Sequence, residues 1–548
     1  MLAPTRGASG SRAFHASRRP WKRRRFWKHS LEEPAGVWGA ECWESHQGNT
    51  GDLTRSRVHS PRQVRYKPVV AKSEPKPREE SEGEVVPLME RTTQPRRREA
   101  PLLQPSRAGR EATVHAREGQ SHPKEKSRGL QRRLYLAAKR SGTRRFHALY
   151  DRMVRPDVLW RAWVEVRANR GSPGIDGVSI EDVERHGVEA YLGELAEDLK
   201  AQRYRPRPVL RVEIPKPDGR KRPLGIPTVR DRVVQQACRI VIEPLFEANF
   251  LPCSHGYRPK RGAGQAVLAV KQALVWRWWV LDADIEGYFD SVDHGILMGL
   301  VRRRVSDRRV LKLIGQWLRA GVVVDGRRQE TRRGVPQGGV ISPLLSNIYL
   351  HTLDRWWQDR HAGVGELHRY CDDFVILCRS RQAAERAREL VAGFLGRLKL
   401  TLHPRKTRVV DMGSCGFDFL GFHFHKLPSR RTGRLVPYAW PSQQAMRTVR
   451  EKIRQQTERT RLRVALGELV GALNRIIRGW RGYFSIGNST KKLADLDRYV
   501  RLRLWRFLKK RQGPRGKFRP EAFVEWERRS GLTYFYPRGL RASQPCTP

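Results

Sequence analysis

Three aspartates, Asp284, Asp372 and Asp373, are the side chains in this sequence best suited to chemistry. Each lies in or beside an apolar run that is typical of a buried strand. Carboxylates brought together on a sheet would bind divalent metal ions, which can catalyse in-line transfer of a phosphoryl group. The chain has a formal net charge of +53, so the substrate that this chemistry predicts is a nucleic acid.

The apolar runs predict where these carboxylates point. Residues 278–285 are β-prone, and Asp282 and Asp284 share one face of that strand because side chains alternate. Residues 367–370 and 374–377 predict two strands with Asp372 at the turn between them, and a tight turn projects its carboxylates out of the sheet. Two adjacent aspartates alone are usually solvent-exposed residues without a catalytic role, so their interpretation depends on the motifs that accompany them.

Other polar residues of this region receive structural interpretations. Asp290 and Asp293 are expected to cap the helix that follows them. Asp282 is interpreted as structural rather than as a metal ligand, and His368 as a residue of a strand.

A hairpin is predicted before the first aspartate. Residues 210–216 and 222–227 are β-prone and flank Pro217-Asp218-Gly219, a strong turn signal. The hairpin would place Lys216 and Arg222 near its tip, where two cations suit a triphosphate. A solvated basic hairpin is the simpler alternative.

A glycine-rich loop precedes a predicted helix. Gln337 lies just before two glycines, where backbone can approach a nucleotide closely. Ser342 is expected to be the N-cap of the helix and Pro343 its first residue. Taken alone, this segment is equally consistent with an ordinary helix entry turn.

Composition restricts the partners and the compartment. Lys and Arg number 109 against 56 Asp and Glu, which indicates a polyanionic partner. A membrane is disfavoured, because no apolar run approaches the ~20 residues of a spanning helix and residues 273–281 are broken by Arg277. The seven cysteines contain no Cys-x-x-Cys pair, so neither a zinc module nor a disulfide framework is predicted and a reducing compartment fits best.

The chain divides by composition into four parts. Residues 1–125 lack apolar periodicity and predict a disordered basic N-terminal region. Residues 126–426 predict a first folded domain, with its core motifs in residues 208–425. Residues 427–511 predict a helical domain, and residues 512–548 a basic tail.

The extreme N-terminus has three interpretations. Residues 1–30 are Arg-rich and contain no acid, as in a transit peptide. A solvated basic tail, or an upstream start codon that extends the reading frame, is favoured over that interpretation.

The order of the motifs resembles the reverse transcriptases encoded by group II introns, the maturase family. The resemblance runs from about Leu130 to about Arg511 and includes Gly174-Ile175-Asp176-Gly177, Ile214-Pro215-Lys216, Arg222-Pro223-Leu224-Gly225-Ile226-Pro227, His255-Gly256-Tyr257-Arg258-Pro259, Ala283-Asp284-Ile285-Glu286-Gly287-Tyr288-Phe289-Asp290, Pro336-Gln337-Gly338-Gly339, Tyr370-Cys371-Asp372-Asp373, Leu402-His403-Pro404-Arg405-Lys406-Thr407 and Phe419-Leu420-Gly421-Phe422. Each motif is weak or moderate alone, but their shared order is specific.

The resemblance implies an α+β right-hand polymerase, with fingers and palm in residues 126–426 and a helical thumb in residues 427–511. It implies two Mg²⁺ ions, with Mn²⁺ as an alternative, and deoxynucleoside triphosphates as substrates. The metal ligands would be Asp284, Asp372, Asp373 and the Ile285 carbonyl. Lys216 and Arg222 would contact the triphosphate. Gln337 would be the glutamine of the nucleotide pocket. Phe289 would be the aromatic residue that excludes a 2′-hydroxyl.

The helical domain adds an expected RNA partner. Residues 462–480 and 499–508 predict amphipathic helices whose other faces carry Arg and Lys, which suits structured RNA. Residues 477–484 resemble the maturase-specific domain, which implies binding to the parent intron RNA and help with its splicing. Target DNA and its primer are the further expected partners, the oligomeric state is left open, and a bacterial cytoplasm is favoured over an organelle.

Two departures from the family pattern matter. Cys371 occupies a position where the family usually has Ala, which affects the expected fidelity more than the expected activity. Residues 512–548 lack the paired cysteines and His-Asn signature of the family's endonuclease domain, so the sequence predicts an endonuclease-lacking protein whose tail, around Trp526 and Tyr534, could at most bind DNA. Two alternatives stay open at this point: a splicing-only cofactor, or the reverse transcriptase of a retron, a diversity-generating element or a CRISPR-associated fusion.

Overall fold

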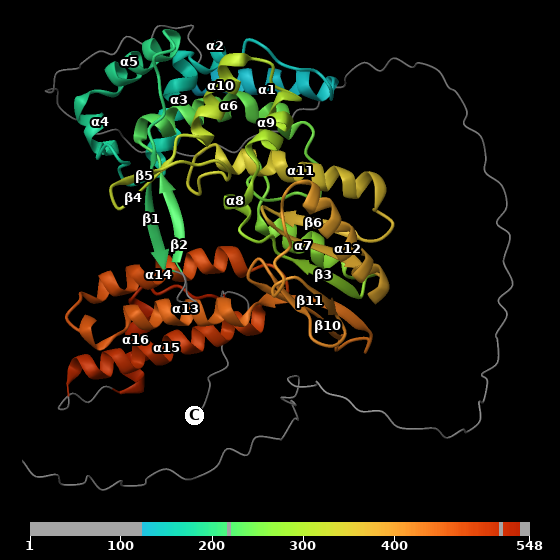
Figure 1. Ribbon diagram of the computed structural model, residues 1–548. Helices are drawn as coiled ribbons and strands as arrows, with labels where there is room; N and C mark the ends of the chain where they lie inside the picture. The colour runs from blue at the N-terminus through green and yellow to red at the C-terminus, as the bar shows by residue number, and fades with distance from the viewer. Residues whose placement is uncertain (1–122, 216–220, 514–518, 537–548) are drawn as a thin grey trace, which may run out of the picture. The chain divides into compact units, whose positions relative to one another are not determined.

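The structure is a computed structural model that describes residues 123–215, 221–513 and 519–536. The described residues all belong to one unit. The disorder and the targeting segment predicted for the N-terminal region, and the turn with Lys216, lie outside the described residues. The described residues form both helices and mainly antiparallel sheets (Figure 1), which confirms the mixed fold class.

Helices dominate the segment before the aspartates. The first helix begins at Pro123, earlier than the apolar periodicity from Leu130 predicts. The helices here are α1 (Pro123–Arg140), α2 (Tyr150–Met153), α3 (Pro156–Ala168), α4 (Ile180–His186), α5 (Val188–Lys200) and α6 (Val229–Glu247). α6 is buried along nearly its whole length, and α1, α2 and α3 pack against it.

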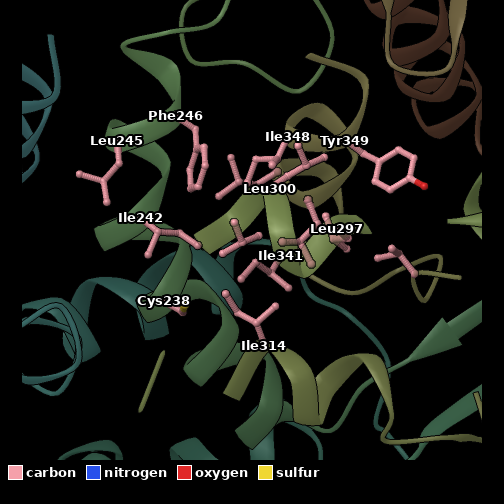
Figure 2. Packing of buried hydrophobic residues seen from close by; sticks show 14 of the residues in the cluster. Cys238, Ile242, Leu245, Phe246, Leu297, Leu300, Ile314, Ile341, Ile348 and Tyr349 are labelled. Carbon is pink, nitrogen blue, oxygen red and sulfur yellow. The ribbon is translucent and has the colours of Figure 1, made fainter. Parts of the chain in front are cut away.

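The largest hydrophobic core joins α6 to helices from much later in the chain. Those helices are α8 (Tyr288–Ser291), α9 (His294–Arg302), α10 (Arg308–Leu318) and α11 (Ser342–Arg360). Figure 2 shows Ile242 and Phe246 of α6 beside Leu300 and Ile348. This core fixes α11 and the loop before it, and that loop carries the predicted site residue Gln337.

A four-stranded antiparallel sheet carries the aspartates. Its strand order is β6-β7-β3-β8, formed by β6 (Glu366–Tyr370), β7 (Asp373–Cys378), β3 (Trp279–Ala283) and β8 (Arg408–Asp411). Helix α12 (Arg381–Arg397) packs on β3, β7 and β8, and α7 (Ala263–Ala273) on β6. The two central strands are buried because both faces are covered, which explains their apolar sequences.

Two further sheets flank this one in the sequence. The first has the order β2-β1-β4-β5, with β1 (Val209–Pro215) and β2 (Lys221–Ile226) as the predicted antiparallel hairpin, followed by β4 (Val322–Val324) and β5 (Arg327–Gln329). The second has the order β11-β10-β9 and comprises β9 (Phe417–Phe419), β10 (Phe422–Pro428) and β11 (Leu435–Pro441).

The last described segment is helical from Gln443 onward, whereas the helical domain predicted from the sequence begins at residue 427; strand β11 occupies residues 435–441 of that range. Its helices are α13 (Gln443–Gln456), α14 (Leu466–Phe484), α15 (Thr490–Gln512) and α16 (Pro520–Arg529), and they share one hydrophobic core. Phe535 is fully buried in that core, at 5.4 Å from the Trp480 ring. The packing of this domain therefore continues past Arg511, and the partly buried Trp526 packs against the same core.

Helix capping corrects two predictions and confirms one. Asp293 caps α9, because its carboxylate accepts from the Ile296 N–H at 2.9 Å. Asp290 lies inside α8 and does not cap α9. Ile341 is the N-cap of α11, while the Ser342 hydroxyl donates to the Pro336 carbonyl at 2.8 Å, so that side chain secures the preceding loop instead of the helix end. None of the described helices is both long enough and apolar enough to cross a lipid bilayer.

Candidate active site

The sheet register brings the aspartates to one end of the sheet. Ala283 pairs with Phe374 across β3 and β7, and Tyr370 pairs with Asp373 across the β6–β7 hairpin. Asp284 directly follows β3, and Asp373 begins β7, so both lie at the same end of these two central strands. A cavity of about 380 Å³ opens there, lined by Asp282, Asp284, Asp373, Arg405, Lys406, Arg408 and Asp418 among others.

The carboxylates influence one another electrostatically. Desolvation, followed by the charges of Asp372, Asp284 and Asp282, raises the pKa of Asp373 to about 7. Desolvation and then the Asp284 charge raise the pKa of Asp372, against the opposing effect of Arg222 and Lys406. Mutual repulsion of this kind is what a bound cation relieves.

Two cations without a predicted role form ion pairs with aspartates at this end of the sheet. Lys406 Nζ lies 2.8 Å from Asp284 Oδ2, and Arg408 Nε lies 3.1 Å from Asp282 Oδ2. Arg408 thus accounts for Asp282 as an ion-paired residue, which agrees with its structural interpretation. In the sequence, Lys406 belongs to the motif at residues 402–407, but nothing in that motif indicates that it pairs with an aspartate far away along the chain.

Metal binding fits the donor chemistry but not the arrangement as it stands. Carboxylate oxygens are the ligands that Mg²⁺ and Mn²⁺ prefer, and the pKa values of Asp372 and Asp373 are raised by desolvation and by the neighbouring carboxylates. Within the described ranges, however, no three His, Cys, Asp or Glu side chains lie close enough to hold an ion. Asp284 contacts Lys406 instead, so ion binding requires this carboxylate to exchange its partner.

The predicted nucleotide side is assembled from the β1–β2 hairpin and the loop before α11. Arg222 Nε donates to Gln337 Oε1 at 3.1 Å, and the Gly225 N–H donates to the Gln337 carbonyl at 2.6 Å. Gly338 has a φ of 111°, and a Cβ there would lie 2.4 Å from the Gly225 carbonyl oxygen. Only glycine permits this close approach, and it brings two predicted triphosphate-pocket residues, Arg222 and Gln337, into contact.

Phe289 joins the same group of elements. Its carbonyl accepts from the Val335 N–H at 2.7 Å, which ties α8 to the Gln337 loop. The Phe289 side chain is 9% exposed, and its ring packs edge-on against Tyr288 at 5.2 Å. The Tyr288 hydroxyl donates to the Ser346 carbonyl on α11. The two aromatic residues are therefore hydrogen-bonded both to α11 and to the loop before it. Ile285, the predicted carbonyl ligand, is buried and bridges to Leu402.

The helices of the last domain present many cations to solvent. Exposed basic side chains on α13, α14 and α15 include Arg447, Arg450, Arg475, Arg478, Arg498, Arg506, Lys509 and Lys510. Their apolar faces are buried in a shared core, which confirms the predicted division between a packed and a basic face. Such a surface suits the phosphates of a nucleic acid.

Carboxylates at one end of a sheet, a cationic hairpin and a glycine-rich loop agree with a protein of the reverse transcriptase class, and the comparison with known families shows that class. Residues 214–424 match the model described as reverse transcriptase (RNA-dependent DNA polymerase), and residues 446–520 match the group II intron maturase-specific domain. The chain belongs to the group II intron-encoded reverse transcriptases and maturases.

Three relatives illustrate the extent of this similarity. Protein YkfC of Escherichia coli (strain K12) is 37% identical over 343 residues, which is 55% of this chain and 88% of YkfC. The group II intron-encoded protein LtrA of Lactococcus lactis subsp. cremoris is 37% identical over 212 residues, which is 38% of this chain and 35% of LtrA. The putative COX1/OXI3 intron 2 protein of Saccharomyces cerevisiae is 30% identical over 206 residues, which is 37% of this chain and 24% of that protein. The match thus spans most of YkfC but only about a third of LtrA.

Proposed function

We propose that this chain copies RNA into DNA by a two-metal mechanism and also binds its parent intron RNA to promote splicing and mobility. The observation that carries the polymerase function is that Asp284 and Asp373 line one cavity at the same end of the sheet. Arg222 lies close enough to lower the pKa of Asp372. Two Mg²⁺ ions, or Mn²⁺ in their place, would activate the primer hydroxyl and stabilise the departing pyrophosphate.

The protein groups in this proposal have separate tasks. Asp284, Asp372 and Asp373, with the Ile285 carbonyl, would hold the ions. Lys406 is the counter-ion of Asp284 before ions bind, and its ammonium stays near enough to interact with incoming phosphate charge.

On the nucleotide side, Arg222 binds the triphosphate of an incoming deoxynucleotide, together with Lys216, and Gln337 aligns the nucleotide. The hydrogen bond between Arg222 and Gln337 holds these two side chains together before substrate arrives. Phe289 packs against the sugar and leaves no room for a 2′-hydroxyl. Its rigid packing supports this role, because a mobile ring would yield to the extra oxygen.

The second activity rests on the maturase-specific domain and the exposed cations of α13–α15. Phosphate contacts would provide most of the affinity for intron RNA, with a strong dependence on salt. A target DNA with its primer is the third proposed partner.

Primer extension tests the polymerase function directly. Purified protein with poly(rA)/oligo(dT), dTTP and Mg²⁺ should extend the primer, and Asp372→Asn should reduce extension by at least about 10³-fold, since several kcal/mol of charge stabilisation are lost. A matched control is Asp418→Asn, which removes a carboxylate of the same cavity outside the metal set. Near-wild-type extension by Asp372→Asn would refute the assigned role of that carboxylate.

A splicing assay separates the two activities. The protein should accelerate splicing of its flanking intron RNA at low Mg²⁺, and Asp372→Asn should retain this effect. Splicing without any primer extension by the wild-type protein would instead support the splicing-only alternative. The match to the maturase-specific domain favours the intron-encoded function over that of a retron or a diversity-generating element.

A further inference from the structure

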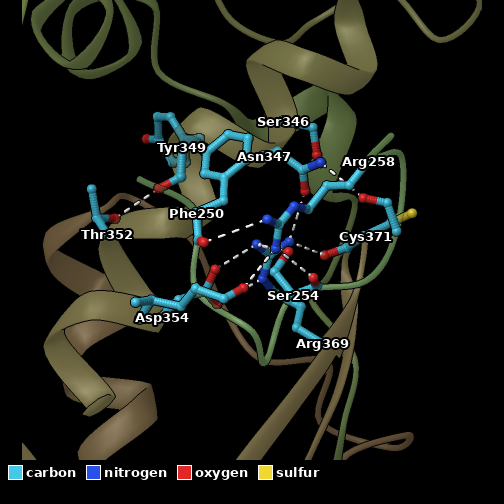
Figure 3. A network of polar contacts seen from close by, with 12 residues as sticks. Phe250, Ser254, Arg258, Ser346, Asn347, Tyr349, Thr352, Asp354, Arg369 and Cys371 are labelled. Atoms are coloured by element: carbon cyan, nitrogen blue, oxygen red, sulfur yellow. Dashed lines mark hydrogen bonds and ion pairs between the residues drawn. The ribbon is translucent and has the colours of Figure 1, made fainter. Parts of the chain in front are cut away.

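Arg369 is a fully buried arginine that directly precedes the turn carrying Asp372 and Asp373. Figure 3 shows its guanidinium group at the centre of a polar network. It makes five hydrogen bonds: Nε to Asp354 Oδ1 (2.8 Å), Nη1 to Asn347 Oδ1 (3.1 Å) and the Cys371 carbonyl (2.8 Å), and Nη2 to Ser254 Oγ (2.7 Å) and Asp354 Oδ2 (2.6 Å). A guanidinium group has five N–H donors, so every donor is used.

The burial of this ion pair has no obvious benefit for stability. The Arg369 and Asp354 side chains are both 0% exposed. Replacing such a pair by well-packed apolar residues is often neutral or stabilising, because desolvation of two charges offsets their attraction. A fully satisfied polar network does, however, impose one geometry on the groups that it contacts.

The geometry imposed here concerns the catalytic turn. Cys371 has a φ of 61°, a left-handed conformation that costs a non-glycine residue of order 1 kcal/mol or more. Its carbonyl points inward to Arg369 Nη1. That carbonyl and the Asp372 nitrogen belong to the same planar peptide, so holding the oxygen also sets the direction in which the Asp372 side chain leaves the turn.

The loop that precedes α7 braces the turn from its other side. The Arg369 N–H donates to the Cys253 carbonyl, and the Arg369 carbonyl accepts from the His255 N–H. Asn347 Nδ2 donates to the Gly256 carbonyl at 2.9 Å. A Cβ on Gly256 would lie 2.6 Å from the Cys371 nitrogen, so the loop backbone lies directly against the turn.

We propose that Arg369 is a positioning residue for polymerisation. It holds the carbonyl of Cys371 while that residue is in its left-handed conformation, and Asp354, Asn347 and Ser254 hold the Arg369 guanidinium group in turn. This inference rests on the proposed polymerase function. It explains why a charged pair is placed in the core behind a carboxylate turn, and why the second residue of that turn is tolerated in a strained conformation.

Arg369→Lys is the first test. Lysine keeps the positive charge opposite Asp354, but one ammonium cannot satisfy the five acceptor contacts, so the Cys371 carbonyl is released. Displacement of reacting groups by about 1 Å can cost about 100-fold in rate, and we expect a loss of this size in kcat for primer extension, with the KM for dTTP unchanged. Intron-RNA splicing should stay at the wild-type level, which reports an intact fold.

Two further variants separate positioning from stability. The double variant Arg369→Met/Asp354→Leu replaces the pair by apolar residues of similar size, and should keep splicing activity and thermal stability while its kcat stays low. Asn347→Ala keeps the ion pair with Asp354 and removes the hydrogen bonds from Asn347 to the Gly256 carbonyl and to Arg369. We expect kcat to fall by about tenfold, which is less than the loss expected for Arg369→Lys. Leu350→Ala, a buried change on the same helix, is the control and should affect stability without a selective loss of kcat.

The outcomes decide the proposal. Wild-type kcat in Arg369→Lys, or recovery of kcat in the apolar double variant, would show that the pair is merely structural. A parallel loss of splicing and extension in all variants, matched by Leu350→Ala, would show the same. If the wild-type protein does not extend a primer at all, the proposed function fails, and that result is distinct from either of these.

Discussion

Lys426 offers a prediction whose size follows from the structure. This lysine of β10 is 1% exposed, its ammonium lies 3.6 Å from the centre of the Trp278 ring, and it donates to the Val275 carbonyl at 3.4 Å. Burial lowers its pKa from 10.5 to about 8. Lys426→Met should therefore stabilise the protein at neutral pH, because methionine fills a similar volume without a charge to desolvate.

The magnitude comes from the change in pKa. Each pKa unit corresponds to about 1.36 kcal/mol, so lowering the pKa from 10.5 to about 8 makes the buried charge cost roughly 3 kcal/mol at pH 7. The contact with Trp278 offsets about 1 kcal/mol of that cost. We expect Lys426→Met to gain about 2 kcal/mol at pH 7 by this reasoning.

The pH dependence is the more specific part of the prediction. Between pH 8 and 10.5 the unfolded chain keeps the lysine proton while the folded chain has lost it, so wild-type stability relative to the variant rises across this window. The advantage of Lys426→Met should shrink toward zero at pH 10.5.

Denaturant unfolding of both proteins from pH 7 to 10.5 measures this difference. Lys452→Met, an exposed lysine on α13, is the control and should change stability little at any pH. The reasoning is refuted if Lys426→Met destabilises the protein at pH 7, or if its advantage does not change with pH.

Three further predictions concern the nucleotide pocket and the histidines. Phe289→Val should admit ribonucleotides, and the ratio of dTTP to UTP incorporation should fall by at least about tenfold, because a pocket of fixed shape rejects the larger sugar by steric clash; an unchanged ratio would exclude Phe289 as the gate. Arg222→Ala should raise the KM for dTTP by about tenfold or more, as loss of a charge-assisted hydrogen bond predicts, while splicing is retained; equal loss of both activities would indicate a folding defect. Burial lowers the pKa of His255 and of His351 to about 4, so the folded state binds fewer protons than the unfolded state and stability should fall as pH drops from 6.5 to 4. His351→Phe, which keeps the edge-on packing with Phe250, should lose less stability over that interval in pH-dependent thermal unfolding; an equal loss would exclude His351 as a source of the acid sensitivity.

The strands that carry the aspartates were predictable from local pattern. The apolar runs around Asp284 and Asp373 have the length and β-branched composition of buried strands, and the structure has β3, β6 and β7 there. The β1–β2 hairpin was predictable for the same reason, because the turn signal and the alternating arms agree. Errors arose at helix ends: Ser342 has the composition of an N-cap, but a loop carbonyl competes for its hydroxyl.

Side-chain partners were less accessible to sequence reasoning. Lys406 and Asp284, or Arg369 and Asp354, are joined by the three-dimensional arrangement of separate elements, and neither pair has a local signature. Arg222 and Gln337 were each predicted for the nucleotide pocket, but their mutual contact depends on the close approach of Gly338 to Gly225.

The sequence by itself determined the chemistry available to this protein: three carboxylates near strand ends, a large excess of cations and an ordered set of motifs that resembles one polymerase family. Residue type and spacing suffice for that, because strand periodicity and charge are local properties. Only the tertiary structure decided how the carboxylates are held and compensated. Packing between segments that are distant in the chain sets the register of β3 against β7, the Lys406 ion pair and the buried network around Arg369. Such packing leaves no periodic pattern in the amino-acid sequence.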